Sequence, residues 1–97
     1  MADPTDTAVV DNPLDSRYEL FLEGRMVGFA DYHVDHDTVV LPHTVIQPSL
    51  RGHGLGERLV QGALDDIRTS GRRIEPRCWY VAQFVDEHPE YEDLVAA

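Results

Sequence analysis

The stretch Arg51-Gly52-His53-Gly54-Leu55-Gly56 separates two segments whose hydrophobic residues follow different periods. Before it, residues 38–46 are rich in β-branched side chains, which favour a strand. After it, apolar residues recur at helical spacing along one stripe, namely at Leu55, Leu59, Val60, Ala63, Leu64 and Ile67. The sequence therefore predicts a strand, a glycine loop and an amphipathic helix, in that order.

The glycine loop has the properties of an anion site. Glycines let the backbone turn tightly and approach a ligand closely, and the free N–H groups and dipole of the following helix favour negative charge there. The Arg51 guanidinium adds a planar donor fork that suits a phosphate oxygen. Two nucleotide patterns do not fit, because Glu57 replaces the last glycine of the dinucleotide fingerprint and the chain has no lysine for a Walker loop.

The segments before the loop predict three antiparallel strands. Residues 17–22, 26–34 and 38–46 alternate or are β-branched, and short polar turns join them. The preceding residues 1–15 have few large apolar groups, which predicts a flexible arm. We therefore expect one domain over residues 16–97, since this length leaves no room for a second.

The segments after the loop complete an α+β domain with a mixed sheet. Gly71 is expected to end the helix, and residues 72–78 to form a strand parallel to the third, because a strand–helix–strand crossover connects them. Pro76 cannot donate to a ladder, so this strand should be locally unpaired or at an edge. A second helix should end at Pro89, and three apolar residues should dock the C-terminus on the core: Tyr91, Leu94 and Val95.

Charge and composition exclude several classes of function. The net charge of −10 argues against a broad nucleic-acid surface, because phosphates would be repelled. No apolar run approaches the roughly 20 residues that cross a bilayer, and the N-terminus lacks the pattern of a secretory signal. One cysteine fits a reducing compartment, so we expect a cytoplasmic protein. The acidity either steers a cationic substrate or serves solubility alone.

The pattern Arg51-x-x-Gly54-x-Gly56, between a strand and a helix, resembles the coenzyme A motif of GCN5-related N-acetyltransferases. Flanking residues extend the resemblance over residues 18–95, notably His43-Thr44-Val45, Pro76-Arg77-Cys78 and His88-Pro89-Glu90-Tyr91. Together they resemble the minimal single-domain members of that superfamily, often called YidJ-like or N-acetyltransferase-domain-containing proteins.

The resemblance implies a truncated acyl-coenzyme A N-acyltransferase fold with acetyl-coenzyme A as co-substrate and no metal. It implies that the pantetheine arm lies between the strand ending near Ile46 and the strand ending near Cys78. Full-length members build the acceptor site with extra helices and strands for which this chain has no length. A second copy or a protein partner is therefore a candidate to complete it. The expected coenzyme-binding residues are Val45, Ile46, Arg51, Gly52, His53, Gly54, Leu55 and Gly56.

Two residues are candidates for the chemistry of acetyl transfer. His43 is a candidate base, because imidazole titrates near neutral pH and the amine must lose a proton; the alternative is a histidine that only packs. Cys78 precedes a helix and is a candidate acid or nucleophile; the alternative is an inert buried thiol.

The remaining polar and aromatic residues have simpler interpretations. His33, Asp35, His36 and Asp37 fall in a predicted turn, where solvation explains them better than a metal site. His88 is expected to be structural, and both Trp79 and Tyr80 are expected in the core rather than over the coenzyme.

Two functions remain open. The first is an N-acetyltransferase that acts on a small amine or a protein lysine. The alternative is a non-catalytic acyl-coenzyme A-binding or sensing module.

Overall fold

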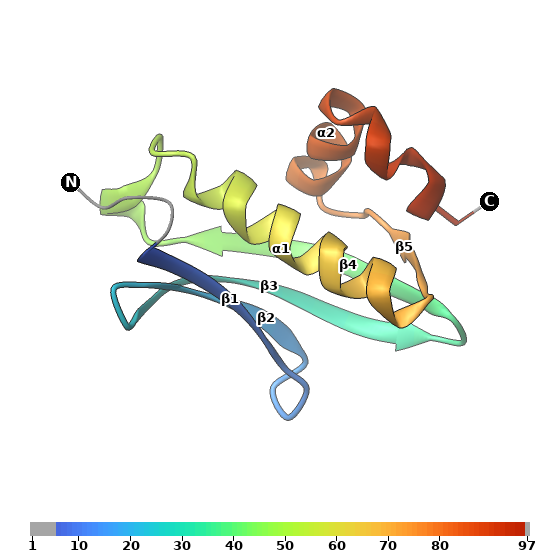
Figure 1. Ribbon diagram of the computed structural model, residues 1–97, viewed down its shortest axis with the longest axis horizontal. Coiled ribbons are helices and arrows are strands. Elements are labelled where there is room, and N and C mark those ends of the chain that lie inside the picture. The colour runs from blue at the N-terminus through green and yellow to red at the C-terminus, as the bar shows by residue number, and fades with distance from the viewer. Residues whose placement is uncertain (1–5, 97) are drawn as a thin grey trace.

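Four antiparallel strands and one parallel strand form the sheet of the computed structural model, which describes residues 6–96 (Figure 1). The strands lie side by side in chain order: β1 (Thr7–Asn12), β2 (Arg17–Leu22), β3 (Arg25–Asp35), β4 (Thr38–Ile46) and β5 (Arg73–Glu75). The helical segments are η2 (Pro48–Leu50), α1 (Leu55–Ser70), α2 (Trp79–Glu87) and η3 (Pro89–Leu94). The predicted mixed sheet, with a helix between the parallel strands, is confirmed.

Residues Thr7–Asn12 form a strand, so the prediction of a flexible arm over residues 1–15 is wrong for them. This strand pairs with β2 along its whole length. It also packs against α1 where that helix has a glycine: a Cβ added to Gly62 would lie 2.6 Å from the Cβ of Val9. Residues 13–15 of the expected arm lie in the turn between β1 and β2, and residues 1–5 lie outside the described residues.

The ladder between β3 and β4 contains a bulge. His33 pairs with Val40 and Asp31 pairs with His43, which leaves two residues of β4 opposite one of β3. One of the two is Pro42, which cannot donate a ladder hydrogen bond and is tolerated at such a position.

The bulge changes which face the later residues of β4 point to. Leu41 belongs to the core under the helices. Thr44 is the cross-strand neighbour of Ala30, another core residue, so Thr44 points to the same side. Because successive side chains of a strand alternate, His43 points to the opposite face.

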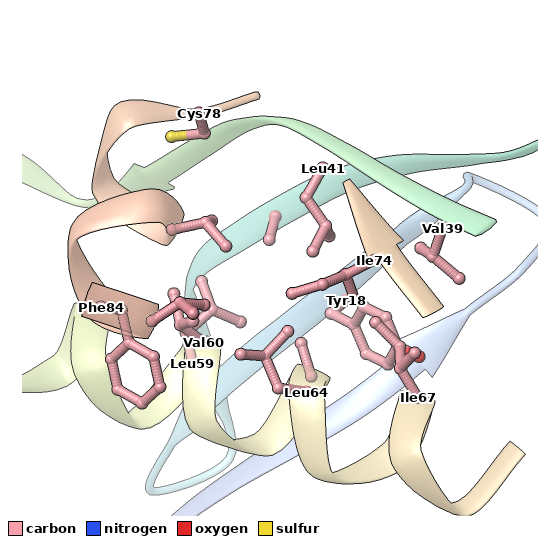
Figure 2. Packing of buried hydrophobic residues seen from close by; sticks show 14 of the residues in the cluster. Tyr18, Val39, Leu41, Leu59, Val60, Leu64, Ile67, Ile74, Cys78 and Phe84 are labelled. Atoms are coloured by element: carbon pink, nitrogen blue, oxygen red, sulfur yellow. The ribbon is translucent and has the colours of Figure 1, made fainter. Parts of the chain in front are cut away.

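The core is one cluster between the sheet and the helices (Figure 2). Buried side chains of α1 meet those of β2, β4, β5 and α2, as the labelled residues show. The core includes the predicted helical stripe except Leu55, which packs partly buried at its edge. Tyr91 and Leu94 are buried as well, which confirms the docking of the C-terminus.

Strand β5 is shorter than predicted. It ends at Glu75, so Pro76 lies beyond it rather than inside it. Past this point β4 and the chain after β5 are joined by one hydrogen bond, from Cys78 N to the Leu41 carbonyl at 2.9 Å. No helix in residues 6–96 is long and apolar enough to cross a membrane.

Candidate functional site

A cavity of about 630 Å³ lies between the glycine loop, the end of β4 and the start of α2. It occupies the place where β4 and the segment after β5 separate. Three parts of the chain line it: Thr44, Ile46 and Leu50; Arg51, Gly52, Gly54, Leu55, Gly56 and Glu57; and Cys78, Trp79 and Tyr80.

The glycine loop delivers unpaired backbone donors to this cavity. Gly52 and Gly54 have positive φ angles of 84° and 76°, which glycine adopts at little cost. Gly54 is the N-cap of α1 and no side chain caps the helix. The first bond along the helix runs from Arg58 N to the Gly54 carbonyl, so the preceding N–H groups lack a helical acceptor. Such groups, together with the helix dipole, form an anion site.

Two charged side chains at the loop oppose each other in their effect on an anion. Arg51 lines the cavity and is exposed, so its guanidinium is available to a phosphate. Glu57 also lines the cavity, in the first turn of α1. Its carboxylate stabilises the helix dipole but repels phosphate. The loop therefore holds an anion chiefly through backbone donors and Arg51.

Tyr80 closes the cavity from α2 against the start of α1. A Cβ added to Gly56 would lie 2.6 Å from the Tyr80 hydroxyl oxygen, so glycine permits this approach. Burial, and then the carboxylates of Glu57 and Glu87, raise the pKa of Tyr80. The phenol is therefore protonated at neutral pH, and it offers a hydroxyl at the wall of the site.

Cys78 lies on the cavity wall. It is a free thiol with 9% exposure, directly before α2. Its side chain makes no capping hydrogen bond to the helix. Of the two catalytic candidates, it is the one that lines the cavity.

His43 lies on the opposite face of the sheet and does not line the cavity. Its Nδ1–H donates to Asp31 Oδ2 at 3.3 Å, and both side chains are solvent-exposed, at 61% and 42%. Its ring lies edge-on to Phe29 with the centroids 6.5 Å apart. Val45, a cross-strand partner of Phe29, shares this face and is also absent from the cavity wall.

A polar network lies beside this pair on β2, where Arg17 is the cross-strand partner of Asp31. Glu19, 9% exposed, accepts hydrogen bonds from Asn12 Nδ2 at 3.0 Å and Arg17 Nε at 2.8 Å. These bonds lower the pKa of Glu19, and the bond from Asn12 has the largest effect. The Arg17 guanidinium also stacks over the Phe29 ring at 4.9 Å. This face of the sheet therefore carries several charged side chains in fixed contacts, and Asp31 is an exposed one.

Three further residues lie at or near the cavity, and His88 lies away from it. His53 of the glycine loop is exposed and is not a wall residue. Trp79 is 73% exposed at the rim, so its expected core position is wrong, because it opens α2 on the side away from the core. His88 donates from Nδ1 to the Phe84 carbonyl at 2.8 Å, as a structural histidine should. Tyr80, also expected in the core, is half-buried on the wall.

Sequence reasoning missed several wall residues, namely Thr44, Leu50, Glu57, Trp79 and Tyr80. Thr44 adjoins His43 in the quoted motif, yet only the bulge directs it inward. In the predicted turn, His36 Nδ1 meets Asp35 Oδ1 at 2.8 Å, both highly exposed. Within residues 6–96, no group of three or more His, Cys, Asp or Glu side chains could hold a metal ion.

Comparisons with known proteins agree on one family. Residues 17–94 match the model described as GCN5-related N-acetyl-transferase. Protein NATD1 of Bos taurus is 35% identical over 57 residues, which cover 59% of this chain and 50% of that protein, so the chain spans about half the length of that relative.

Two solved structures share the fold. A GCN5-like putative N-acetyltransferase from Staphylococcus aureus superposes with a TM-score of 0.70 at 17% identity, covering 96% of this chain and 91% of that one. The PaiA N-acetyltransferase of Thermoplasma acidophilum, in complex with coenzyme A, superposes with a TM-score of 0.55 at 14% identity, covering 76% and 48%. The predicted acyltransferase-like fold is confirmed.

Proposed function

We propose, from the premise that this chain belongs to the GCN5-related N-acetyltransferase family, that it binds acetyl-coenzyme A in the cavity and transfers the acetyl group to an amine. The observation that carries the proposal is the glycine loop, whose uncapped helix N-terminus opens into the cavity that also contains Cys78. The N–H groups of the loop and Arg51 would bind the pyrophosphate. The pantetheine arm would pass between β4 and α2.

His43 is proposed as the base that takes the proton of the amine. Its neighbour Thr44 lines the cavity, so one strand separates the imidazole from the bound thioester. Pairing between β4 and β5 stops at Val40 and Glu75, and β5 does not cover the edge of β4 beyond. An amine could approach from the face that carries His43 and reach the thioester past this edge. The Nδ1–H bond to Asp31 leaves Nε2 as the basic nitrogen.

Cys78 is proposed as the second catalytic group, in one of two roles. As an acid, its thiol would protonate the departing coenzyme thiolate. As a nucleophile, its thiolate would accept the acetyl group before the amine does. The roles differ in one observable, because only the nucleophile forms a covalent acetyl-enzyme.

A second function, a non-catalytic acyl-coenzyme A-binding module, is favoured by a specific observation. His43 does not face the cavity, so turnover requires the acceptor to come from the other side of the sheet. In this alternative the chain binds coenzyme without transferring the acyl group to any acceptor.

Calorimetric titration with acetyl-coenzyme A tests the binding that both functions share. We expect saturable binding by the wild type and a loss of binding in Gly54→Glu, which places a carboxylate where the phosphates would lie. Absence of binding by the wild type would refute both functions.

Turnover distinguishes the two functions and tests the two residues. Thiol release from acetyl-coenzyme A, with a panel of amines and a lysine peptide, should fall at least tenfold in His43→Gln, as for loss of a general base. His36→Gln is the matched control, because it also carries an Asp partner but lies in the distant turn. Cys78→Ser should lower turnover as well, and intact-protein mass spectrometry reveals any acetyl-enzyme. Binding without thiol release for every amine would favour the sensing module.

A further inference from the structure

The Thr44 hydroxyl is a buried polar atom without a hydrogen-bond partner. Its Oγ1 is the one such side-chain nitrogen or oxygen found among residues 6–96. Buried hydroxyls in folded proteins are nearly always hydrogen-bonded, because an unsatisfied one destabilises the fold. A valine would fill the same shape without that cost, so the hydroxyl calls for a reason outside the free protein.

Thr44 lies on the cavity wall beside apolar neighbours on its own face of the sheet. Across the ladder lies Ala30, and along the strand on the same side lies Ile46. Thr44, Ile46 and Cys78 all line the cavity. Threonine populates more than one χ1 well in a strand, so a rotation about this bond can present Oγ1 to a group in the cavity.

We propose that the Thr44 hydroxyl donates a hydrogen bond to the thioester carbonyl oxygen of bound acetyl-coenzyme A, an inference that rests on the proposed function. The glycine loop binds the phosphates at one wall, and the acyl end lies at the other, beside Cys78. The thioester carbonyl is an acceptor without a donor of its own, and the hydroxyl supplies one donor.

The same bond strengthens as the reaction proceeds. When the amine nitrogen bonds to the carbonyl carbon, the carbonyl electron pair moves onto the oxygen, whose charge the hydroxyl then stabilises. The pair returns as the carbon–sulfur bond breaks, and the coenzyme leaves as a thiolate that takes up a proton. The amine loses its own proton to the base. Thr44 gives and takes no proton in this sequence, so its role is to polarise and position the carbonyl.

Thr44→Val tests the inference, because it removes the hydroxyl and keeps the shape. Calorimetry compares acetyl-coenzyme A with S-ethyl-coenzyme A, in which a methylene replaces the carbonyl. We expect Thr44→Val to bind acetyl-coenzyme A about three- to tenfold more weakly, as for loss of one hydrogen bond, and S-ethyl-coenzyme A equally well. Thr44→Ser should restore the affinity for acetyl-coenzyme A. The free Thr44→Val protein should be at least as stable as the wild type in urea.

The outcomes separate this inference from the proposed function. If the wild type binds both ligands and Thr44→Val weakens both equally or neither, the inference is wrong and the proposed function stands. If Thr44→Val unfolds more easily than the wild type, the hydroxyl has a structural role and the inference is wrong. If the wild type binds neither ligand, the proposed function fails and the inference fails with it.

Discussion

Replacement of Gly54 by alanine tests whether the glycine loop is the phosphate site. Gly54 has φ of 76°, and a Cβ added there would meet no heavy atom within 4 Å. The cost is therefore conformational rather than steric. Alanine in the left-handed region costs roughly 1–2 kcal/mol, and the smaller entropy of its unfolded chain returns about 0.4–1 kcal/mol. A net cost of about 1 kcal/mol follows.

The matched control is Gly24→Ala in the turn between β2 and β3. Gly24 has φ of 81° and equally open space, so its substitution carries the same cost. Strand pairing from Leu22 and Arg25 holds this turn on both sides. The cost should therefore appear as lower stability, with a midpoint of thermal unfolding about 4–8 °C lower.

Gly54 lies between η2 and α1 without strand pairing on either side, so we expect its loop to relax in the free protein. The conformational cost of alanine at this position should then appear as weaker binding, because the ligand requires the original arrangement of N–H groups. We expect Gly54→Ala to bind acetyl-coenzyme A about fivefold more weakly, the equivalent of about 1 kcal/mol, and Gly24→Ala to bind it like the wild type. Calorimetry and thermal unfolding on the same samples measure both quantities. An unchanged Kd in Gly54→Ala, or an equal loss of affinity in both variants, refutes the reasoning.

Three further predictions concern stability, each measured by urea unfolding. Gly62→Ala gains about 1 kcal/mol of helix propensity, but the new Cβ overpacks against Val9 at a cost of about 1–3 kcal/mol. We therefore expect no net gain in the free energy of unfolding. A gain of the full amount, about 1 kcal/mol, would show that β1 does not dock there. Hydrogen bonds lower the pKa of Glu19, so its stabilisation is present above the ordinary carboxyl pKa and is lost as the pH falls through the lowered one; Glu19→Gln should flatten this acid limb. Burial, and then Asp65, raise the pKa of Tyr91 to about 12, so stability should fall as the pH rises from about 10 toward 12. Tyr91→Phe should reduce this loss of stability between about pH 10 and 12. An equal loss in Tyr91→Phe and the wild type would refute the role given to Tyr91.

Local patterns predicted the larger part of the fold. The helical stripe of α1 and its end at Gly71 follow from residue spacing and a single glycine conformation, both of which are local properties. The short polar turns expected after β2 and β3 are present, each with two residues between the strands, and His36 has a positive φ of 57° in the second. Each of these features depends on neighbours in the sequence, which is why a single sequence suffices.

Strand β1 could not be predicted in the same way. Its stability comes from backbone pairing with β2 and from the close approach of Val9 to a helix glycine 53 positions later, on roughly opposite halves of the chain. The composition of residues 7–12 reveals neither of these contacts. Residues 1–15 have few large apolar groups, which predicted an arm, and within β1 only Thr7, Val9 and Asn12 are partly buried.

The candidate site also has one part that neighbouring residues predict and one part that they do not. The glycine loop was predictable, because strand, glycines and helix are consecutive. The side of the sheet reached by His43 was not, because a bulge consumes one residue of β4 and reverses the alternation after Pro42. Counting by two from Leu41 would place His43 in the cavity and Thr44 outside it. The structure has the reverse.

Strand β4 consequently separates two sites by the thickness of one backbone, with the cavity on one side and the Asp31–His43 pair on the other. In the proposed reaction the two substrates would enter from opposite faces of the sheet. With Cys78 as the acid, neither substrate would block the entry or exit of the other, so either could bind first and either product could leave first. Product-inhibition kinetics would then show free coenzyme A competing with acetyl-coenzyme A but not with the amine.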